Sequence, residues 1–407
     1  MKLLKYTKVT LLVFLLIFLA LSYHPSFSTI ESGGTSQSPI LRFIPVLASV
    51  LIMLSLNISA IWKEPFIRNY ILLLVAGALC GLLLLGLGFG TEYISEITNI
   101  SMAIGFLIVG YNLNIKQGGI FLLIILFASA IAITSYSNIM TYIGAFTIED
   151  QYLTRAKNTF SVMIVTAYTC VAYYLMSDYH ITYPRLEKII KPLLFILSLT
   201  FILFTVTMRA RTGMLSLFII TIILIYKTKY ISQKHISSIL AAFIIIGFAI
   251  IARFDFNSIY DFIYSAFFQN REGDLTSGRS ETYIQAWHIF ANNPLWGRLG
   301  DNIEITWVHN YLLKNLADFG ILGGLFIIWM YLYLCITVII RIWNHKDNRF
   351  ASLGFFSMLP LLFVSLAEPT LPYSPGTSIF LAFLCFGYSL RENMKRAYNN
   401  IPSQTIK

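Results

Sequence analysis

Long apolar runs alternate with short polar connections along almost the whole chain. A helix that crosses a bilayer needs about twenty mostly apolar residues, and twelve runs approach this length. They lie at about residues 10–22, 43–62, 70–88, 100–113, 119–136, 160–176, 192–208, 213–226, 236–252, 319–340, 350–366 and 377–390. The pattern predicts an all-α, polytopic membrane protein with about twelve transmembrane helices. The first, fourth, eighth and twelfth runs are short, so the predicted number carries a tolerance of one or two.

The composition indicates that a bilayer, not water, surrounds most of the chain. Of the 407 residues, 57% are hydrophobic and 12% are charged, and the mean hydropathy is +0.73. Soluble domains carry about 25% charged residues. The four cysteines all fall inside apolar runs and form no CxxC pair, so we expect neither a disulfide framework nor a zinc site. Residues 22–25 (Ser-Tyr-His-Pro) lack the small side chains of a signal-peptide cleavage site, which favours an uncleaved first span.

The charged residues are unevenly divided between the two sides of the predicted membrane. With the N-terminus inside, the cytoplasmic segments hold 19 of the 29 lysines and arginines, and the outer segments hold 10. Acidic residues divide the other way, 5 inside and 14 outside, which gives net charges of +14 and −4. An excess of Lys and Arg marks cytoplasmic loops, so we expect both termini in the cytoplasm. These basic clusters face anionic membrane lipids, and they explain the positive net charge without nucleic acid as a partner.

One outer connection is large enough to fold above the membrane. We therefore divide the chain into residues 1–252 with transmembrane helices 1–9, a large helical extracytoplasmic loop at 253–318, and residues 319–407 with transmembrane helices 10–12 and a cytoplasmic tail. Within the loop, apolar residues at helical spacing predict an amphipathic helix over 280–291. It ends before Asn293-Pro294, because proline disfavours helical geometry in the residue before it. A second helical stretch begins near His309 and leads towards the tenth span.

Three arginines and one histidine are the first candidates for chemistry. Arg279 lies in the first turn of the loop helix, where its guanidinium and free backbone N–H groups suit a phosphate; the alternative is a solvated loop arginine. His309 is either a structural residue or a proton acceptor, a role that neutral imidazole fills well near neutral pH. Arg209 and Arg211 lie in a short outer turn between the seventh and eighth spans. They either serve function there or extend to the lipid headgroups.

Together these segments resemble the loop signature of the O-antigen ligase and Wzy-type polysaccharide polymerase superfamily. The resemblance rests on residues 278–283 (Gly-Arg-Ser-Glu-Thr-Tyr) with Trp287, residues 293–297 (Asn-Pro-Leu-Trp-Gly), and His309-Asn310 followed after nine residues by Gly-Ile-Leu-Gly at 320–323. Residues 211–215 (Arg-Thr-Gly-Met-Leu) resemble the family's arginine at the outer start of a middle span. The resemblance extends over roughly 155–323, whereas the first five spans contribute only generic hydrophobicity.

The resemblance implies an activity and a set of roles. Family members move a glycan from undecaprenyl diphosphate to an acceptor hydroxyl at the outer face of the bacterial inner membrane, without nucleotide sugars, a cofactor or a required metal. By resemblance, His309 is the catalytic base, and Arg279 and Arg211 stabilise the diphosphate. Substrate-binding roles are expected for Arg209, Arg155, Lys157, Asn158 and Asn310. The sequence has no suitably placed DxD motif and no GxxxxGK[ST] phosphate loop.

The sequence leaves the acceptor open. The motifs serve polymerases, which extend a lipid-linked chain together with a chain-length regulator, and equally ligases, which transfer the glycan to lipid A-core. Residues 155–159 (Arg-Ala-Lys-Asn-Thr) resemble a Lys-Asn pattern of capsule and O-antigen polymerases, which favours a polymerase. A flippase for lipid-linked oligosaccharides would also fit twelve spans. It should, however, have two related halves and charged residues within the spans, and the sequence shows neither.

Overall fold

The computed structural model describes most of the predicted helices. The described residues are 2–21, 30–31, 34–35, 39–86, 91–113, 115–142, 152–207, 211–228, 279–298, 308–345, 349–369, 371–373 and 377–399. The predicted ninth span (236–252), residues 253–278 and 299–307 of the large loop, and Arg209 lie outside the described residues.

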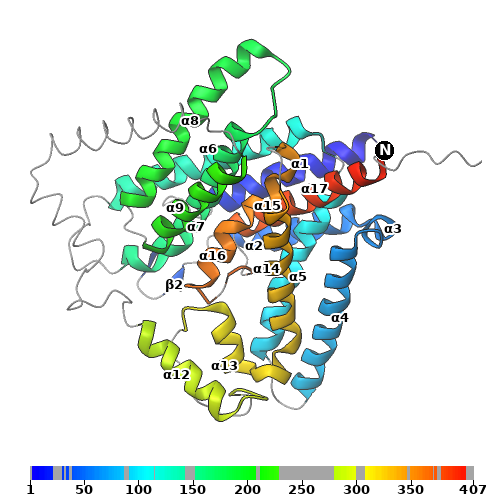
Figure 1. Ribbon diagram of the computed structural model, residues 1–407, viewed down its shortest axis with the longest axis vertical. Coiled ribbons are helices and arrows are strands. Elements are labelled where there is room, and N and C mark those ends of the chain that lie inside the picture. Colours follow the sequence, from blue (N-terminus) through cyan, green and yellow to red (C-terminus); the bar gives the residue numbers. More distant parts are fainter. Residues whose placement is uncertain are drawn as a thin grey trace, which may run out of the picture.

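The N-terminal half is a series of helices. Their bounds are α1 (Lys2–Leu21), α2 (Pro39–Ser55), α3 (Ile58–Ile61), α4 (Pro65–Gly86), α5 (Thr91–Asn112), α6 (Gln117–Tyr142), α7 (Tyr152–Met176), α8 (Pro184–Thr207) and α9 (Arg211–Thr228). A two-residue antiparallel pair, β1 (Ile30–Glu31) and β2 (Gly34–Thr35), lies between α1 and α2. Figure 1 shows these helices packed side by side as one bundle.

The C-terminal part continues the bundle and adds two helices beside it. Their bounds are α12 (Arg279–Asn292), α13 (Tyr311–Gly323), α14 (Leu325–Trp343), the short 3-10 helix η1 (Phe350–Ser352), α15 (Leu353–Ser357), α16 (Leu359–Ser365) and α17 (Thr377–Asn399). In Figure 1, α12 and α13 lie together at one end of the molecule, below the body of the bundle. The all-α prediction is confirmed for the described residues, apart from the β1–β2 pair.

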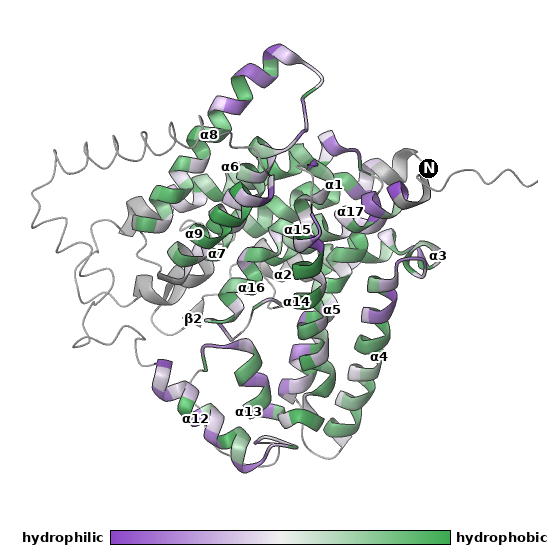
Figure 2. Ribbon diagram, viewed as in Figure 1, coloured by the Kyte–Doolittle hydropathy of each residue, from purple (hydrophilic) through white to green (hydrophobic). Residues whose placement is uncertain are grey.

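Five described helices are long and apolar enough to cross a membrane. They are Pro65–Gly86, Thr91–Asn112, Gln117–Ser137, Pro184–Val206 and Leu325–Trp343. Shorter apolar helical stretches lie at Tyr6–Leu21, Val46–Ser55, Ser161–Met176, Thr212–Thr228 and Phe350–Ser365. Figure 2 shows hydrophobic residues along nearly all of α4 and α9, whereas α12 is mixed. Only 22% of the best windows of α4 and α8 is buried within the molecule, so their apolar side chains suit contact with lipid.

Several predicted boundaries need correction. The fourth run, predicted at 100–113, is part of α5, which begins at Thr91; its polar first two turns lower the hydropathy without preventing a helix. The eleventh run, predicted as one span over 350–366, is divided into η1, α15 and α16. The seventh run, predicted at 192–208, is the C-terminal part of α8, which begins at Pro184 and continues through Pro192. Hydropathy marks which residues suit the membrane core, and it is a poor guide to where a helix begins and ends.

The core of the bundle lies around α5, α7 and α17. Small residues let α5 and α17 approach closely, because Gly110 lies against the Leu384 carbonyl and Gly387 against the Leu107 carbonyl. Almost every side chain of α7 between Ser161 and Tyr174 is buried. The bundle therefore offers a firm frame, and the loop helices attach to it near the N-terminal end of α5 and the C-terminal end of α16.

Candidate functional site

The loop helices α12 and α13 pack side by side and run in the same direction. Their shared core consists of Ala286, Val308 and Ala317, with Tyr283, Ile289 and Leu313 packed around it. Near the start of α12, the Tyr283 hydroxyl donates to the His309 carbonyl at 2.6 Å. Beyond its end, the Ile321 N–H donates to the Pro294 carbonyl at 2.8 Å. The N-termini of both helices therefore lie at the same end of the pair.

Two glycines allow a close backbone contact at the other end of the α12–α13 pair. Gly297 and Gly320 have φ angles of +62° and +65°, which L side chains rarely adopt. A Cβ on Gly297 would lie 2.6 Å from the Gly320 nitrogen, and a Cβ on Gly320 would lie 2.5 Å from the Gly297 nitrogen. We call the crossing of residues 293–297 with residues 320–323 the elbow. The elbow gives Gly297 and Gly320 a structural role, because each must take a positive φ and let the other backbone approach.

Asn310, the residue after His309, fixes the start of α13 from two sides. Asn310 is the N-cap of α13, where its side-chain oxygen accepts from the Leu313 N–H at 2.9 Å. The Asn310 amide nitrogen donates to the Leu366 carbonyl, just after α16, at 3.1 Å. Both ends of the Asn310 amide are thus engaged in fixing α13, which is a structural use of a residue predicted to bind substrate. The imidazole that precedes it is placed between the loop and the bundle.

Arg279 and His309 meet at a carboxylate that the sequence analysis missed. The Arg279 Nη2 lies 3.5 Å from the Glu368 Oε1, and the His309 Nδ1 lies 3.9 Å from the Glu368 Oε2. The three side chains are 23%, 31% and 17% exposed for Arg279, His309 and Glu368. Each oxygen of one carboxylate therefore faces a different cationic or basic group, at a place that solvent reaches in part.

The surroundings suit proton transfer and anion binding. The His309 Nδ1 is buried and has no hydrogen-bond partner among the described residues, and the Glu368 carboxylate faces it at 3.9 Å. Burial raises the pKa of Tyr283, which the Arg279 charge lowers and the Glu368 charge raises. Tyr283 therefore stays protonated at neutral pH and remains a hydrogen-bond donor to the His309 backbone. A carboxylate beside Nδ1 favours the tautomer that is protonated there, in which the other ring nitrogen can accept a proton.

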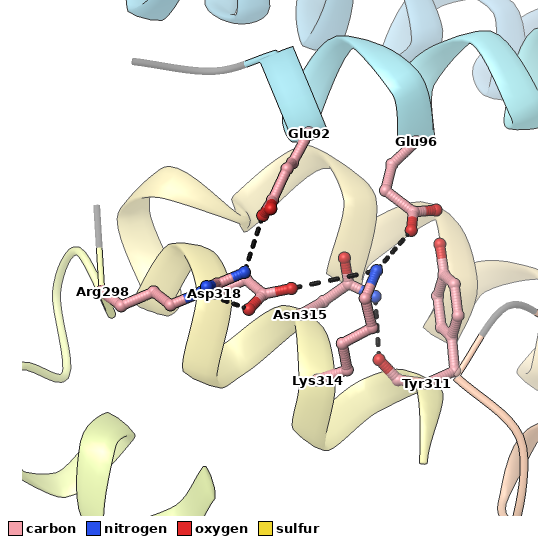
Figure 3. Close-up of polar contacts among 7 residues, drawn as sticks. All are labelled: Glu92, Glu96, Arg298, Tyr311, Lys314, Asn315 and Asp318. Carbon is pink, nitrogen blue, oxygen red and sulfur yellow. Dashed lines mark hydrogen bonds and ion pairs between the residues drawn. The ribbon is translucent and has the colours of Figure 1, made fainter. Parts of the chain in front are cut away.

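A second group of charges ties the loop helices to the bundle. Arg298 pairs with Asp318 and Glu92, both at 2.8 Å, and Lys314 pairs with Glu96 at 2.6 Å and with Asp318 at 3.8 Å. We call these five residues the clasp. Figure 3 shows Glu92 and Glu96 reaching from α5 towards the Arg298 and Lys314 side chains. Because α5 packs in the core, the clasp fixes α13 and the elbow to the rigid part of the molecule.

The clasp is a positioning device more than a source of large stability. The Asp318 side chain is 4% exposed. Burial raises its pKa, and the charges of Lys314 and Arg298 lower it without offsetting the burial. Desolvation of this kind cancels much of the attraction between buried ions. Close to Asp318 along α13, the Tyr311 ring packs on the rings of Tyr331 and Tyr373, with centroid distances of 5.1 and 5.7 Å. These aromatic contacts add an apolar interaction between α13 and the bundle.

The other predicted site residues are not joined to this group by any described contact. Arg155, Lys157 and Asn158 lie in the first turns of α7, and Arg211 is the first residue of α9. Their side chains are outside the described part of the structure, as is the whole of Arg209. Their predicted roles therefore stay predictions. The described structure joins only Arg279 and His309 of the predicted catalytic residues.

Glu368 had a signal in the sequence. It is the single charged residue between the eleventh and twelfth apolar runs, in a connection that also contains Pro369 and Pro372. In a chain with so few charges, an isolated carboxylate directly after an apolar run is a candidate for function. The clasp had no such signal, because Glu92 and Glu96 lie more than 200 residues from Arg298 and Lys314 in the sequence.

No protein-family model and no curated protein matches this chain. The family resemblance therefore rests on the motifs, and the case for function rests on the geometry of Arg279, His309 and Glu368.

Proposed function

We propose that this chain is a membrane glycosyltransferase that polymerises undecaprenyl-diphosphate-linked oligosaccharide repeat units into O-antigen or capsular polysaccharide. It would act at the outer face of the bacterial inner membrane. One observation carries the proposal: Arg279 and His309 face the two oxygens of Glu368, at the shared N-terminal end of α12 and α13. This arrangement joins an anion-binding group to a proton acceptor, which are the two needs of transfer from a diphosphate carrier.

The proposal includes about twelve spans with both termini in the cytoplasm. In support, the clasp joins the loop to Glu92 at the start of α5, which follows the C-terminal end of α4. The basic residues Lys63 and Arg68 lie at the other end of α4. The candidate site and the basic connection thus belong to opposite ends of the same helix. Under the positive-inside rule the site side is the outer side.

Binding of the donor diphosphate follows from charge. The first turns of α12 and α13 carry backbone N–H groups and the positive ends of two helix dipoles. Arg279 is the first residue of α12 and adds a guanidinium that can hold a phosphate through two hydrogen bonds. In the free protein Glu368 lies where an anion is favoured. A diphosphate would take over that interaction, and its growing negative charge on departure would be stabilised by Arg279.

The chemical step needs one proton acceptor. The acceptor hydroxyl oxygen forms a bond to the anomeric carbon of the donor glycan, and the bond from that carbon to the diphosphate oxygen breaks. The electron pair leaves with the diphosphate, and the hydroxyl proton passes to the free nitrogen of His309. Glu368, beside the other nitrogen, orients the ring and stabilises the imidazolium that forms, as the carboxylate does in serine-protease triads.

The acceptor distinguishes the proposal from its alternatives. A polymerase uses a second lipid-linked glycan and works with a chain-length regulator, and a ligase uses lipid A-core. The Lys-Asn resemblance at 155–159 favours the polymerase. A flippase would need no proton acceptor beside a phosphate-binding arginine, so the Arg279–Glu368–His309 group argues against it.

Deletion of the gene followed by gel analysis of surface glycan tests the proposal. Chains that stop at one repeat indicate a polymerase, full-length polymer left on its carrier indicates a ligase, and unchanged glycan contradicts both. Complementation with His309→Ala should lose activity by roughly 10²–10⁴-fold at unchanged membrane abundance. His288→Ala is the matched control, because His288 is exposed on α12 and should retain full activity. Full activity of His309→Ala would remove it as the base.

A further inference from the structure

An uncharged apolar surface covers the elbow. Its four large side chains, Leu295, Trp296, Ile321 and Leu322, are 45–50% exposed. They belong to two segments held together by backbone hydrogen bonds, Ile321 N–H to the Pro294 carbonyl and Leu322 N–H to the Leu295 carbonyl. A single exposed apolar side chain is ordinary on a protein surface. A contiguous group of them indicates a contact with another apolar phase.

This surface continues onto a helix that suits the membrane. The elbow leads directly into α14, which is apolar and long enough to cross a bilayer. Leu325 and Trp329, in the first two turns of α14, are 44% and 56% exposed. On the other side, Ile284 and Trp287 of α12 are 57% and 55% exposed. The elbow thus lies between the lipid-facing side of a span and the apolar side of an amphipathic helix.

The charges beside the elbow point away from this surface. Residues 293–297 and 320–325 contain no charged side chain. The next residue, Arg298, is turned inward to Asp318 and Glu92. Asn292 and Asn293, the polar residues that precede Pro294, carry no charge. Tryptophan is typical of the boundary between headgroups and acyl chains; Trp296 lies on this surface, and Trp287 is exposed on the neighbouring α12.

We propose that the elbow is a lipid anchor: Leu295, Trp296, Ile321 and Leu322 insert into the outer leaflet at the boundary between headgroups and acyl chains. The occupant of the surface is bilayer lipid. The anchor holds α12 and α13 against the membrane as a monotopic element does. If the proposed function also holds, it keeps the Arg279 end of α12, about 20 Å away along the helix, near the level of the donor diphosphate.

Tryptophan fluorescence measures this directly and needs no glycan substrate, so it is independent of the proposed function. The full-length protein is prepared with Trp296 as its single tryptophan, the other five being changed to Phe. It is placed in nanodiscs whose phosphatidylcholine is brominated either near the headgroup or near the middle of the chain. We expect strong quenching of Trp296 by the shallow bromine, weaker quenching by the deep bromine, and little quenching by iodide in the buffer. A matched variant with only Trp329 should respond more strongly to the deep bromine.

Trp296 quenched by iodide and insensitive to both brominated lipids would overturn the anchor, and would leave the surface to a protein partner. Should the single-tryptophan protein fail to fold, Trp296→Phe in the otherwise natural chain gives the same information by difference. Loss of part of the shallow-bromine quenching in that variant supports the anchor, and unchanged quenching refutes it.

Discussion

Replacement of Gly297 by alanine tests whether the elbow sets the position of the candidate site. A Cβ at this position would lie 2.5 Å from the Ala317 carbonyl oxygen and 2.6 Å from the Gly320 nitrogen. Both are backbone atoms, so no side-chain rotation can relieve the contact. The φ of +62° adds about 1–2 kcal/mol for an L residue, and overpacking adds about 1–3 kcal/mol. We therefore expect Gly297→Ala to destabilise the elbow by roughly 2–5 kcal/mol.

That loss is a large part of the free energy that holds a domain together, which is about 5–15 kcal/mol. We expect the elbow to open and α12 to separate from α13 while the bundle stays folded. The measurements are the fraction of protein that stays monodisperse after heating in detergent and the rate of proteolysis within 279–298. Gly86→Ala is the control, because a Cβ there meets no atom within 4 Å. If both variants show the same heat resistance and proteolysis, the elbow does not hold the helices together.

Three further outcomes follow from the charges. An imidazolium and a carboxylate 3.9 Å apart attract by about 4 kcal/mol at an effective dielectric constant near 20, and solvent exposure reduces this attraction. We therefore expect Glu368→Gln to slow glycan transfer by roughly 10–100-fold. Unchanged rates would exclude Glu368 as the partner of His309. Arg279→Lys should weaken transfer about tenfold or more, because lysine lacks the two-pronged contact to phosphate, and a normal glycan ladder would contradict the phosphate role. Arg298→Met should destabilise the protein by roughly 3 kcal/mol, because it leaves the Asp318 carboxylate buried with one distant partner. The double variant with Asp318→Asn should lose less stability than the single variant, as measured by thermal unfolding. An equal or larger loss of stability in the double variant would refute this account.

The parts of the fold that depend on local signals were predictable from the sequence. The loop helix predicted at 280–291 is α12 (Arg279–Asn292), because its apolar spacing and the Asn-Pro stop are both local. The second loop helix, predicted to begin near His309, begins at Tyr311 with Asn310 as its cap. The predicted continuity into the tenth span is broken at Gly320, which has a positive φ. A glycine near a helix end allows such a kink but does not reveal it.

The parts that depend on distant pairing were not predictable. Glu368 follows the short apolar helix α16 and carries no motif of its own, and its two partners lie 59 and 89 positions earlier in the chain. Glu92 and Glu96 stand in a segment that hydropathy assigned to a connection, although it is the first part of α5. Only the packing of α13 against α5 turns these carboxylates into partners for Arg298 and Lys314.

The spacing between His309 and Gly320 has a geometric explanation in α12 and α13. They are tied at two levels, once by Tyr283 to His309 and once by Pro294 to Ile321. Eleven residues separate the two ties on the first chain segment and twelve on the second, so both helices advance by nearly the same length, about 17 Å. Equal advance keeps the two N-termini level, and it is this level arrangement that brings the guanidinium of Arg279 and the imidazole of His309 to one carboxylate. A change of a single residue in either interval would rotate one terminus by about 100°. The interval between His309 and Gly320 therefore sets the geometry of the candidate site, although Gly320 itself lies at the far end of α13.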